Sequence, residues 1–230
     1  MDFQLVWQYF PDLLNGAWLT IELVALSLFV GFFLAFICGL AALSRYHLLR
    51  YLAQSYMFIF RGSPLLIQIY LIYYGSSQIS WIKDSFLWAI LSQAYWCALI
   101  ALTLNTAAYT AEIVRGAIRN IPQGAIEAGK SFGMSRWLLF RRITLPQTLR
   151  LMIPAYSNEV IQMLHASALV GAITLMDLTA TAQNLISRTY ASYSFYLAIA
   201  VIYLVTTYVI SGIFRLLERR LYRHLRLNEA

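Results

Sequence analysis

The chain has 230 residues, of which 60% are hydrophobic and only 12% are charged, and its formal net charge is +7. Soluble domains contain about 45–50% apolar and about 25% charged residues, so this composition excludes an ordinary soluble domain and indicates a chain that is solvated largely by membrane lipid. The basic residues gather at positions 115–150 and 215–226 without a basic face interleaved with aromatic residues, so nucleic-acid binding is not expected.

Five apolar stretches predict transmembrane helices, because a bilayer core about 30 Å thick needs about 20 apolar helical residues. Four of them cover Leu23–Leu43, Phe86–Ala111, Leu151–Met176 and Thr189–Phe214. The fifth lies within Tyr51–Ile82, where Arg61-Gly62-Ser63-Pro64 interrupts it. It begins either near Tyr51 with an irregular turn or only at Pro64. Residues 1–44 contain no Lys or Arg, so the first stretch is expected to remain as a span and not to be cleaved as a signal peptide.

The distribution of basic residues predicts the orientation. Fourteen of the seventeen Lys and Arg residues fall on one side if the 45–50 loop, the 115–150 loop and the C-terminal tail share that side. The positive-inside rule makes this side cytoplasmic, with the N-terminus periplasmic and the C-terminus cytoplasmic. The tail is interpreted as a topological anchor, and its arginines are Arg215, Arg219, Arg220, Arg223 and Arg226.

Residues 124–131 read Gly-Ala-Ile-Glu-Ala-Gly-Lys-Ser and match the phosphate-loop pattern G-x-x-x-x-G-K-[ST]. A working phosphate loop follows a buried strand in an α/β sheet, whereas here the preceding residues continue a membrane helix up to Ile121-Pro122. The match is therefore interpreted as accidental. The two cysteines, Cys38 and Cys97, lie in apolar runs, and the three histidines have no ligand spacing. No metal, nucleotide or other cofactor is expected.

The same stretch fits a longer pattern, E-A-A-x3-G-x9-I-x-L-P, with one departure, Gly129 in place of Ala. The matching positions are Glu127, Ala128, Gly129, Gly133, Ile143, Leu145 and Pro146. Pro122 suits the first turn of a short helix, and Gly133 permits a sharp turn into a second one that carries apolar side chains. Such a helix-turn-helix elbow suits a groove on a partner protein. It resembles the EAA loop of binding-protein-dependent ABC permeases.

The resemblance extends over about two-thirds of the chain. Residues 60–68, Phe-Arg-Gly-Ser-Pro-Leu-Leu-Ile-Gln, and residues 105–116 resemble the polar amino-acid permease subgroup. Residues 156–169 are similar to arginine and histidine permease subunits of Gram-negative bacteria. The resemblance implies an all-α integral membrane protein with five transmembrane helices and the MetI-like ABC permease fold. It would be one domain, 1–230, with a cytoplasmic coupling loop at 116–146.

Membership of this family implies a non-enzymatic subunit of an importer in the bacterial inner membrane. The partners implied are a cytoplasmic ABC ATPase dimer that hydrolyses ATP, a second homologous or identical permease, a periplasmic amino-acid-binding protein and the surrounding lipid. The substrate would be a basic or polar amino acid of the arginine or histidine/lysine type. The alternative is an ion-coupled secondary transporter or channel for amino acids, against which the absence of inverted repeats argues.

Polar side chains at membrane depth are the candidate substrate pathway, because ionisable groups there are costly and face a bundle interior or a watery cavity. Asn105, Tyr109 and Glu112 share one face of the third span by their spacing. Arg115 can pair with Glu112. These two residues either form an ion pair that anchors the helix end or have a role in transport, and the sequence favours neither interpretation.

The fourth span repeats this pattern with Asn158, Gln162 and His165, and Glu159 lies on the adjoining edge. This face either lines the pathway or forms hydrogen bonds between helices. A cationic substrate group needs a carboxylate partner outside water. We expect Glu159 to bind the guanidinium or imidazole of the substrate, with Glu112 as the second candidate. Asn158 or Gln162 would bind the polar remainder.

Overall fold

The structure is a computed structural model that describes residues 3–221, and in this range it is helical and contains no strand. Three helices are long and apolar enough to cross a membrane, and two bent helix pairs raise the number of spans to five if each pair counts as one. The predicted all-α membrane fold is thereby confirmed. Arg223 and Arg226 of the predicted anchor lie outside the described residues.

The three long helices are α2 (Phe10–Ala41), α7 (Ala94–Arg119) and α12 (Ser192–Leu221). Their limits differ from the predicted ones, because an apolar run identifies the lipid-compatible residues and not the ends of a helix. The start at Leu23 was wrong, since Pro11 opens α2 in its first turn. A short helix α1 (Phe3–Gln8) precedes it.

The predicted span Phe86–Ala111 begins and ends about eight residues before the helix α7 that the structure shows there. Its first residues form a separate short helix, α6 (Trp88–Leu91), after another short helix, α5 (Ser80–Lys83). The long helix α7 continues past Ala111 to Arg119, although Glu112 and Arg115 are charged. These two residues form an ion pair with each other, so the helix carries them without an isolated charge.

The uncertain fifth span is broken, as the first of the two alternatives predicted. Helix α3 (His47–Gly62) ends before Pro64, and α4 (Leu65–Tyr70) with its π-helical continuation Leu71–Gly75 leaves at an angle of 106°. Proline lacks the backbone N–H that a helix needs and disfavours the helical conformation of the residue before it. Helix α3 itself starts at His47 and not near Tyr51.

The fourth predicted span, Leu151–Met176, is also longer and broken. Helix α9 (Arg136–Leu139) leads through a π-helical turn, Phe140–Thr144, into α10 (Leu145–Ala166). Pro154 therefore lies inside α10 and not near its start. After a 3-10 segment, Ser167–Ile173, the chain bends by 52° into α11 (Leu178–Thr189), and Asp177 caps α11 by accepting hydrogen bonds from two backbone N–H groups.

A stripe of small residues joins α2 to α7. A Cβ atom added to Gly31 would lie 2.7 Å from Cγ2 of Thr106, and one added to Gly39 would lie 2.9 Å from Cγ1 of Val114. Ala35, between the two glycines, is fully buried. Gly31, Ala35 and Gly39 recur every four residues along α2, and the two helices approach each other so closely there that only small residues fit.

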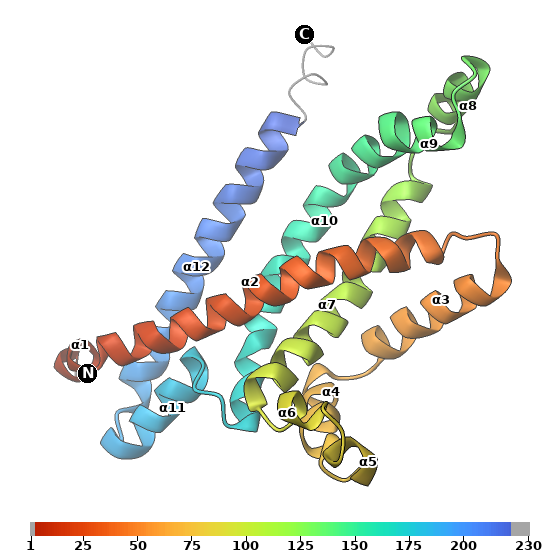
Figure 1. Ribbon diagram of the computed structural model, residues 1–230. Helices are drawn as coiled ribbons and strands as arrows, with labels where there is room; N and C mark the ends of the chain where they lie inside the picture. Colours follow the sequence, from red (N-terminus) through yellow and green to blue (C-terminus); the bar gives the residue numbers. More distant parts are fainter. Residues whose placement is uncertain (1–2, 222–230) are drawn as a thin grey trace.

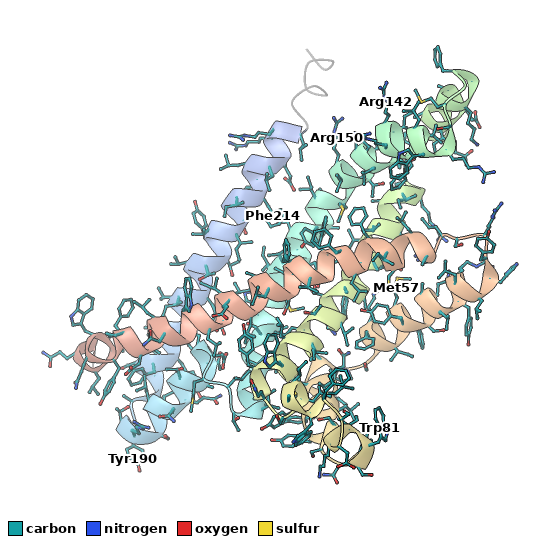
Figure 2. All side chains as sticks on the ribbon, viewed as in Figure 1. Met57, Trp81, Arg142, Arg150, Tyr190 and Phe214 are labelled. Carbon is teal, nitrogen blue, oxygen red and sulfur yellow. The ribbon has the colours of Figure 1, made fainter. Side chains whose placement is uncertain are left out.

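The two ends of the molecule differ in their residues. Figure 1 shows the hairpin of α8 (Gln123–Ser131) and α9 at the same end as the last turn of α12, away from α1, α5 and α11. Figure 2 shows Arg142 and Arg150 at the hairpin end and Trp81 and Tyr190 at the opposite end. The hairpin and the end of α12 therefore lie at the same end of the molecule, and the assignment of this end to the cytoplasm stays a prediction.

Substitution of Gly39 by Ala should destabilise the protein by about 1–3 kcal/mol, because the new methyl group has no room between the two helices. The same change at Gly212 of α12, where nothing lies within 4 Å, should be neutral or stabilising because alanine favours the helix. Thermal unfolding in detergent, followed by tryptophan fluorescence, measures both variants. An equal midpoint for Gly39→Ala and Gly212→Ala would contradict the close packing of α2 on α7.

Candidate functional site

The candidate site forms around the break between α3 and α4. Ser63 has an extended backbone (φ −115°, ψ 147°), and Pro64 after it cannot donate a backbone hydrogen bond. The last carbonyl groups of α3 therefore lose the partners that a continuing helix would supply. Inside a bilayer no water takes the place of these lost hydrogen-bond donors, so other groups of the protein must donate to the carbonyls.

Two buried amides satisfy this broken helix end. Nε2 of Gln68, in α4, lies 2.8 Å from the carbonyl oxygen of Phe60 and 3.1 Å from that of Ser63 and donates to both. Nδ2 of Asn105, in α7, donates to the Phe60 carbonyl at 3.3 Å and to Oε1 of Gln68 at 3.0 Å. The hydroxyl of Ser63 donates to the carbonyl of Ile59 at 2.7 Å. The break is thus held by the side chains of Ser63 itself, of Gln68 in α4 and of Asn105 in α7.

Two arginines form ion pairs with Glu112 of α7 next to this break. Nη1 of Arg61, in the last turn of α3, lies 3.4 Å from Oε2 of Glu112. Nε of Arg115 donates to the same oxygen at 2.9 Å, and Nη2 of Arg115 pairs with the other carboxylate oxygen. The Arg61 guanidinium also lies 5.5 Å from the centre of the Tyr109 ring, whose hydroxyl is 3.4 Å from the Arg61 carbonyl. The predicted Glu112–Arg115 pair is confirmed, and Arg61 joins it.

A cavity of about 420 Å³ opens beside the break, between α3, α4, α7 and α10. Its lining consists of Arg61, Gly62, Ser63, Pro64, Leu65, Asn105, Tyr109, Glu159, Gln162, Met163 and Ala166. Four of the predicted pathway residues lie here together, although they come from two different spans. Sites for small molecules have volumes of about 300–1,000 Å³ with a few convergent polar groups, and this cavity has that form.

Glu159 is the buried carboxylate of this cavity. Its residue is 6% exposed, and its Oε1 accepts a hydrogen bond of 2.9 Å from the hydroxyl of Thr106 in α7. Among residues 3–221 it forms no ion pair. A buried carboxylate with a single neutral hydrogen bond is costly for the protein to maintain. It is therefore a group that a cation entering the cavity would stabilise.

The face of α10 that borders the cavity differs from the predicted one. Glu159, Gln162 and Ala166 line the cavity, whereas Asn158 and His165 do not. Nε2 of His165 lies 3.2 Å from the hydroxyl oxygen of Thr207 in α12, so this side chain is directed toward a different helix. The sequence spacing identified a polar side of the helix, but the packing turns its Glu159 edge toward α7.

Sequence reasoning missed the contribution of the α3–α4 segment. Arg61 was treated only as a residue of an uncertain span, and Gln68 was not considered as a site residue. The signal was present in the Arg-Gly-Ser-Pro run, because a proline inside an apolar stretch leaves carbonyls unpaired that polar side chains must then satisfy. Glu112 lies outside the cavity lining but contacts it through Arg61.

A second candidate site is the hairpin at the far end of α7. Helix α8 is followed by Gly133 with a positive φ of 72°, a conformation that favours glycine, and then by α9. Glu127 and Ala128 are exposed, whereas Gly129 is buried. A Cβ atom on Gly129 would lie 2.5 Å from Cδ1 of Leu139 and 2.8 Å from Cδ1 of Ile143, so glycine allows α8 to lie close to the second arm.

The hairpin exposes large aromatic side chains away from the apolar spans. Phe132 is 86% exposed, and Trp137 is 70% exposed and stacks on Phe140 with ring centres 5.9 Å apart. Leu145 and Pro146 begin α10 directly after this segment. The match to a phosphate loop lies entirely in α8, which follows a helix and not a strand.

Comparison with known proteins gives consistent similarities. A family model described as "Binding-protein-dependent transport system inner membrane component" matches residues 27–223. The octopine transport system permease protein of Rhizobium radiobacter is 47% identical, covering 97% of this chain and 91% of that protein. The histidine/lysine/arginine/ornithine transport system permease protein of Escherichia coli is 38% identical, covering 92% of this chain and 90% of its own length.

The chain is also similar to solved structures. A crystal structure of an amino acid ABC transporter with histidines has a TM-score of 0.86 and 34% sequence identity, with 96% of this chain and 99% of that chain covered. An inward-facing structure of the MetNI methionine ABC transporter has a TM-score of 0.73 at 22% identity, with 96% and 99% covered. This second likeness shows the fold alone.

Substitution of Gln68 by Leu should lower the stability by about 1–3 kcal/mol, because it removes the donor to the Ser63 carbonyl and the shorter of the two donors to the Phe60 carbonyl. Gln78→Leu is the matched control, since Gln78 lies on the exposed turn after the π-helical segment and donates only to the neighbouring Ser77 at 3.5 Å. Thermal unfolding in detergent compares the two. If both variants unfold at the wild-type temperature, Gln68 does not hold the break.

Proposed function

The chain belongs to the family of binding-protein-dependent transport system inner membrane components, and from this membership we propose that it is the permease subunit of an ABC importer for a basic or polar amino acid. It is a multi-pass protein of the bacterial inner membrane. Its relatives are named for the transport of octopine, nopaline, and histidine/lysine/arginine/ornithine. All of these compounds combine a basic group with at least one carboxylate.

The observation that carries this proposal is the unpaired carboxylate of Glu159 in the cavity beside the broken helix. A cationic side chain that leaves water needs a charged or strongly polar partner. Glu159 offers one on a wall of the cavity, and Gln162 adds an amide for the polar remainder of the substrate. Asn105 and Tyr109 complete the lining, while they also support the end of α3.

The remaining polar residues belong to the proposed pathway beyond the cavity. Asn158 lies about one turn nearer to the hairpin end of α10 than Gln162, and it is exposed. We assign it to the stretch that the substrate passes after it leaves the cavity. His165 lies beyond Gln162 in the other direction along α10 and is directed toward α12, so it would border the route ahead of the cavity, and Glu112 would act through its ion pair with Arg61.

The energy for transport would come from partner subunits. The 116–146 segment, with Glu127, Ala128, Gly129, Gly133, Ile143, Leu145 and Pro146, is the proposed cytoplasmic docking element for an ABC ATPase dimer. Its two exposed aromatic side chains support this role, because they suit an apolar groove on another protein. A second permease, homologous or identical, and a periplasmic amino-acid-binding protein would complete the importer. ATP hydrolysis would lie in the ATPase subunits.

Glu159→Gln should reduce the uptake of arginine about tenfold or more, because the amide keeps the shape of the side chain but loses the charge that binds the cation. Uptake of labelled L-arginine into membrane vesicles that contain the assembled importer measures this effect. Glu218→Gln, in the last part of α12 and outside the cavity, is the matched control and should transport normally. Wild-type uptake by Glu159→Gln in an intact complex would refute the role of Glu159.

Gly133→Val should release the ATPase, because a β-branched residue at φ 72° is strained and the turn between α8 and α9 must open. Gly133→Asn should keep the ATPase bound, since asparagine tolerates the left-handed conformation. Co-purification of the ATPase with each variant tests the docking role. Retention of the ATPase by Gly133→Val would show that the hairpin geometry is not needed for docking.

A further inference from the structure

The cavity contains one cationic side chain besides its carboxylate. Arg61 lines the cavity at the last turn of α3, and 39% of its side chain is exposed. Its guanidinium approaches Glu112 through Nη1 alone, at 3.4 Å, and donates no hydrogen bond within the described part of the chain. Since a guanidinium has five N–H donors in a planar fork, most of the binding capacity of Arg61 is unused.

Glu112 does not depend on Arg61 for its charge balance. Arg115 contacts both carboxylate oxygens of Glu112, through Nε at 2.9 Å and through Nη2. A bidentate pair of this kind is stronger than a single contact at 3.4 Å. If the Arg61 guanidinium turned away from Glu112, the carboxylate would keep its stronger partner, so the movement of Arg61 has a small electrostatic cost.

The two charged side chains of the cavity have opposite signs and come from different helices. Glu159 is on α10 and Arg61 is on α3, and both line the same cavity of about 420 Å³. A ligand that satisfies both must carry a cation at one end and an anion at the other. We propose that Arg61 is the receptor for the α-carboxylate of the substrate, opposite Glu159. This inference rests on the proposed function, in which Glu159 binds the cationic group.

Arg61 would bind the carboxylate by exchanging partners. In the structure its Nη1 faces Glu112, and on substrate entry the guanidinium turns into the cavity and donates two parallel hydrogen bonds to the carboxylate. The ring of Tyr109, 5.5 Å from the guanidinium carbon, guides this movement because it attracts the cation on its face. The cavity would thereby select amino acids and related carboxylates over simple amines or guanidines.

Binding of two probes to the purified complex of the permease subunits and the ATPase, without the periplasmic binding protein, tests this inference. L-arginine carries the α-carboxylate, and agmatine is the same molecule without it, so the ratio of their affinities isolates the carboxylate contact. Isothermal titration calorimetry is carried out on the wild type, Arg61→Gln, Arg61→Lys and Glu159→Gln. Arg50→Gln is the matched control, because Arg50 also belongs to α3 but its side chain contacts the neighbouring His47 and does not line the cavity.

The wild type should bind L-arginine roughly tenfold or more tightly than agmatine, since a charge-assisted bidentate contact is lost with the carboxylate. Arg61→Gln should remove this preference and leave the affinity for agmatine unchanged. Arg61→Lys, which keeps the charge but not the fork, should show an intermediate preference and carries the test if Arg61→Gln does not assemble. Arg50→Gln should keep the wild-type ratio.

Two outcomes separate this inference from the proposed function. The carboxylate contact is overturned if Arg61→Gln or Arg61→Lys keeps the wild-type ratio of affinities for L-arginine and agmatine. It is also overturned if the wild type shows no preference for L-arginine. In both cases the role of Glu159 stands. Wild-type affinity of Glu159→Gln for both probes contradicts the proposed function and, with it, this inference. Loss of both affinities in Glu159→Gln alongside loss of only the preference in Arg61→Gln supports the two assignments together.

Discussion

The broken helix at Ser63 and Pro64 is the constraint on which the site depends. A bilayer core offers no water to unpaired backbone groups, so the chain can leave the helical conformation there only where other protein groups donate to its carbonyls. Gln68 and Asn105 supply these donors, and Tyr109 approaches the Arg61 carbonyl. The polar side chains and the cavity beside them therefore have one common cause. A proline stops the helix, amides satisfy its end, and the turn leaves a space lined by polar groups.

The packing of α2 on α7 determines where the carboxylate of this space lies. Gly31 lets α2 approach the part of α7 that carries Thr106, because a Cβ atom at Gly31 would meet the Thr106 methyl group at 2.7 Å. The hydroxyl of the same Thr106 donates to Glu159. The small residues of α2 do not contact the substrate in this proposal. They position Thr106, and Thr106 donates a hydrogen bond to the Glu159 carboxylate. The site is a product of helix packing as much as of its own polar residues.

The sequence predicted the helical fold, the break and four polar residues of the cavity, but not how the residues meet. The shared face of Asn105, Tyr109 and Glu112 followed from helical spacing, yet its partner, the end of α3, depends on a tertiary contact. The rotation of α10 is of the same kind, since the spacing grouped Asn158 and His165 with Gln162, whereas the packing turns the edge with Glu159 and Gln162 toward the cavity. Helix ends were misplaced where charges such as Glu112 and Arg115 neutralise each other inside a span. Each error comes from a contact between segments that a single helical pattern does not contain.

The central claim is that the substrate binds beside the broken helix, between α3 and α10. A cryo-electron microscopy structure of the assembled importer with L-arginine bound tests it most directly. The account predicts that the ligand occupies the cavity lined by Glu159 and Gln162, with its guanidinium within hydrogen-bond distance of the Glu159 carboxylate. A ligand found elsewhere, for example between α10 and α12 beside His165 and Thr207, would contradict it.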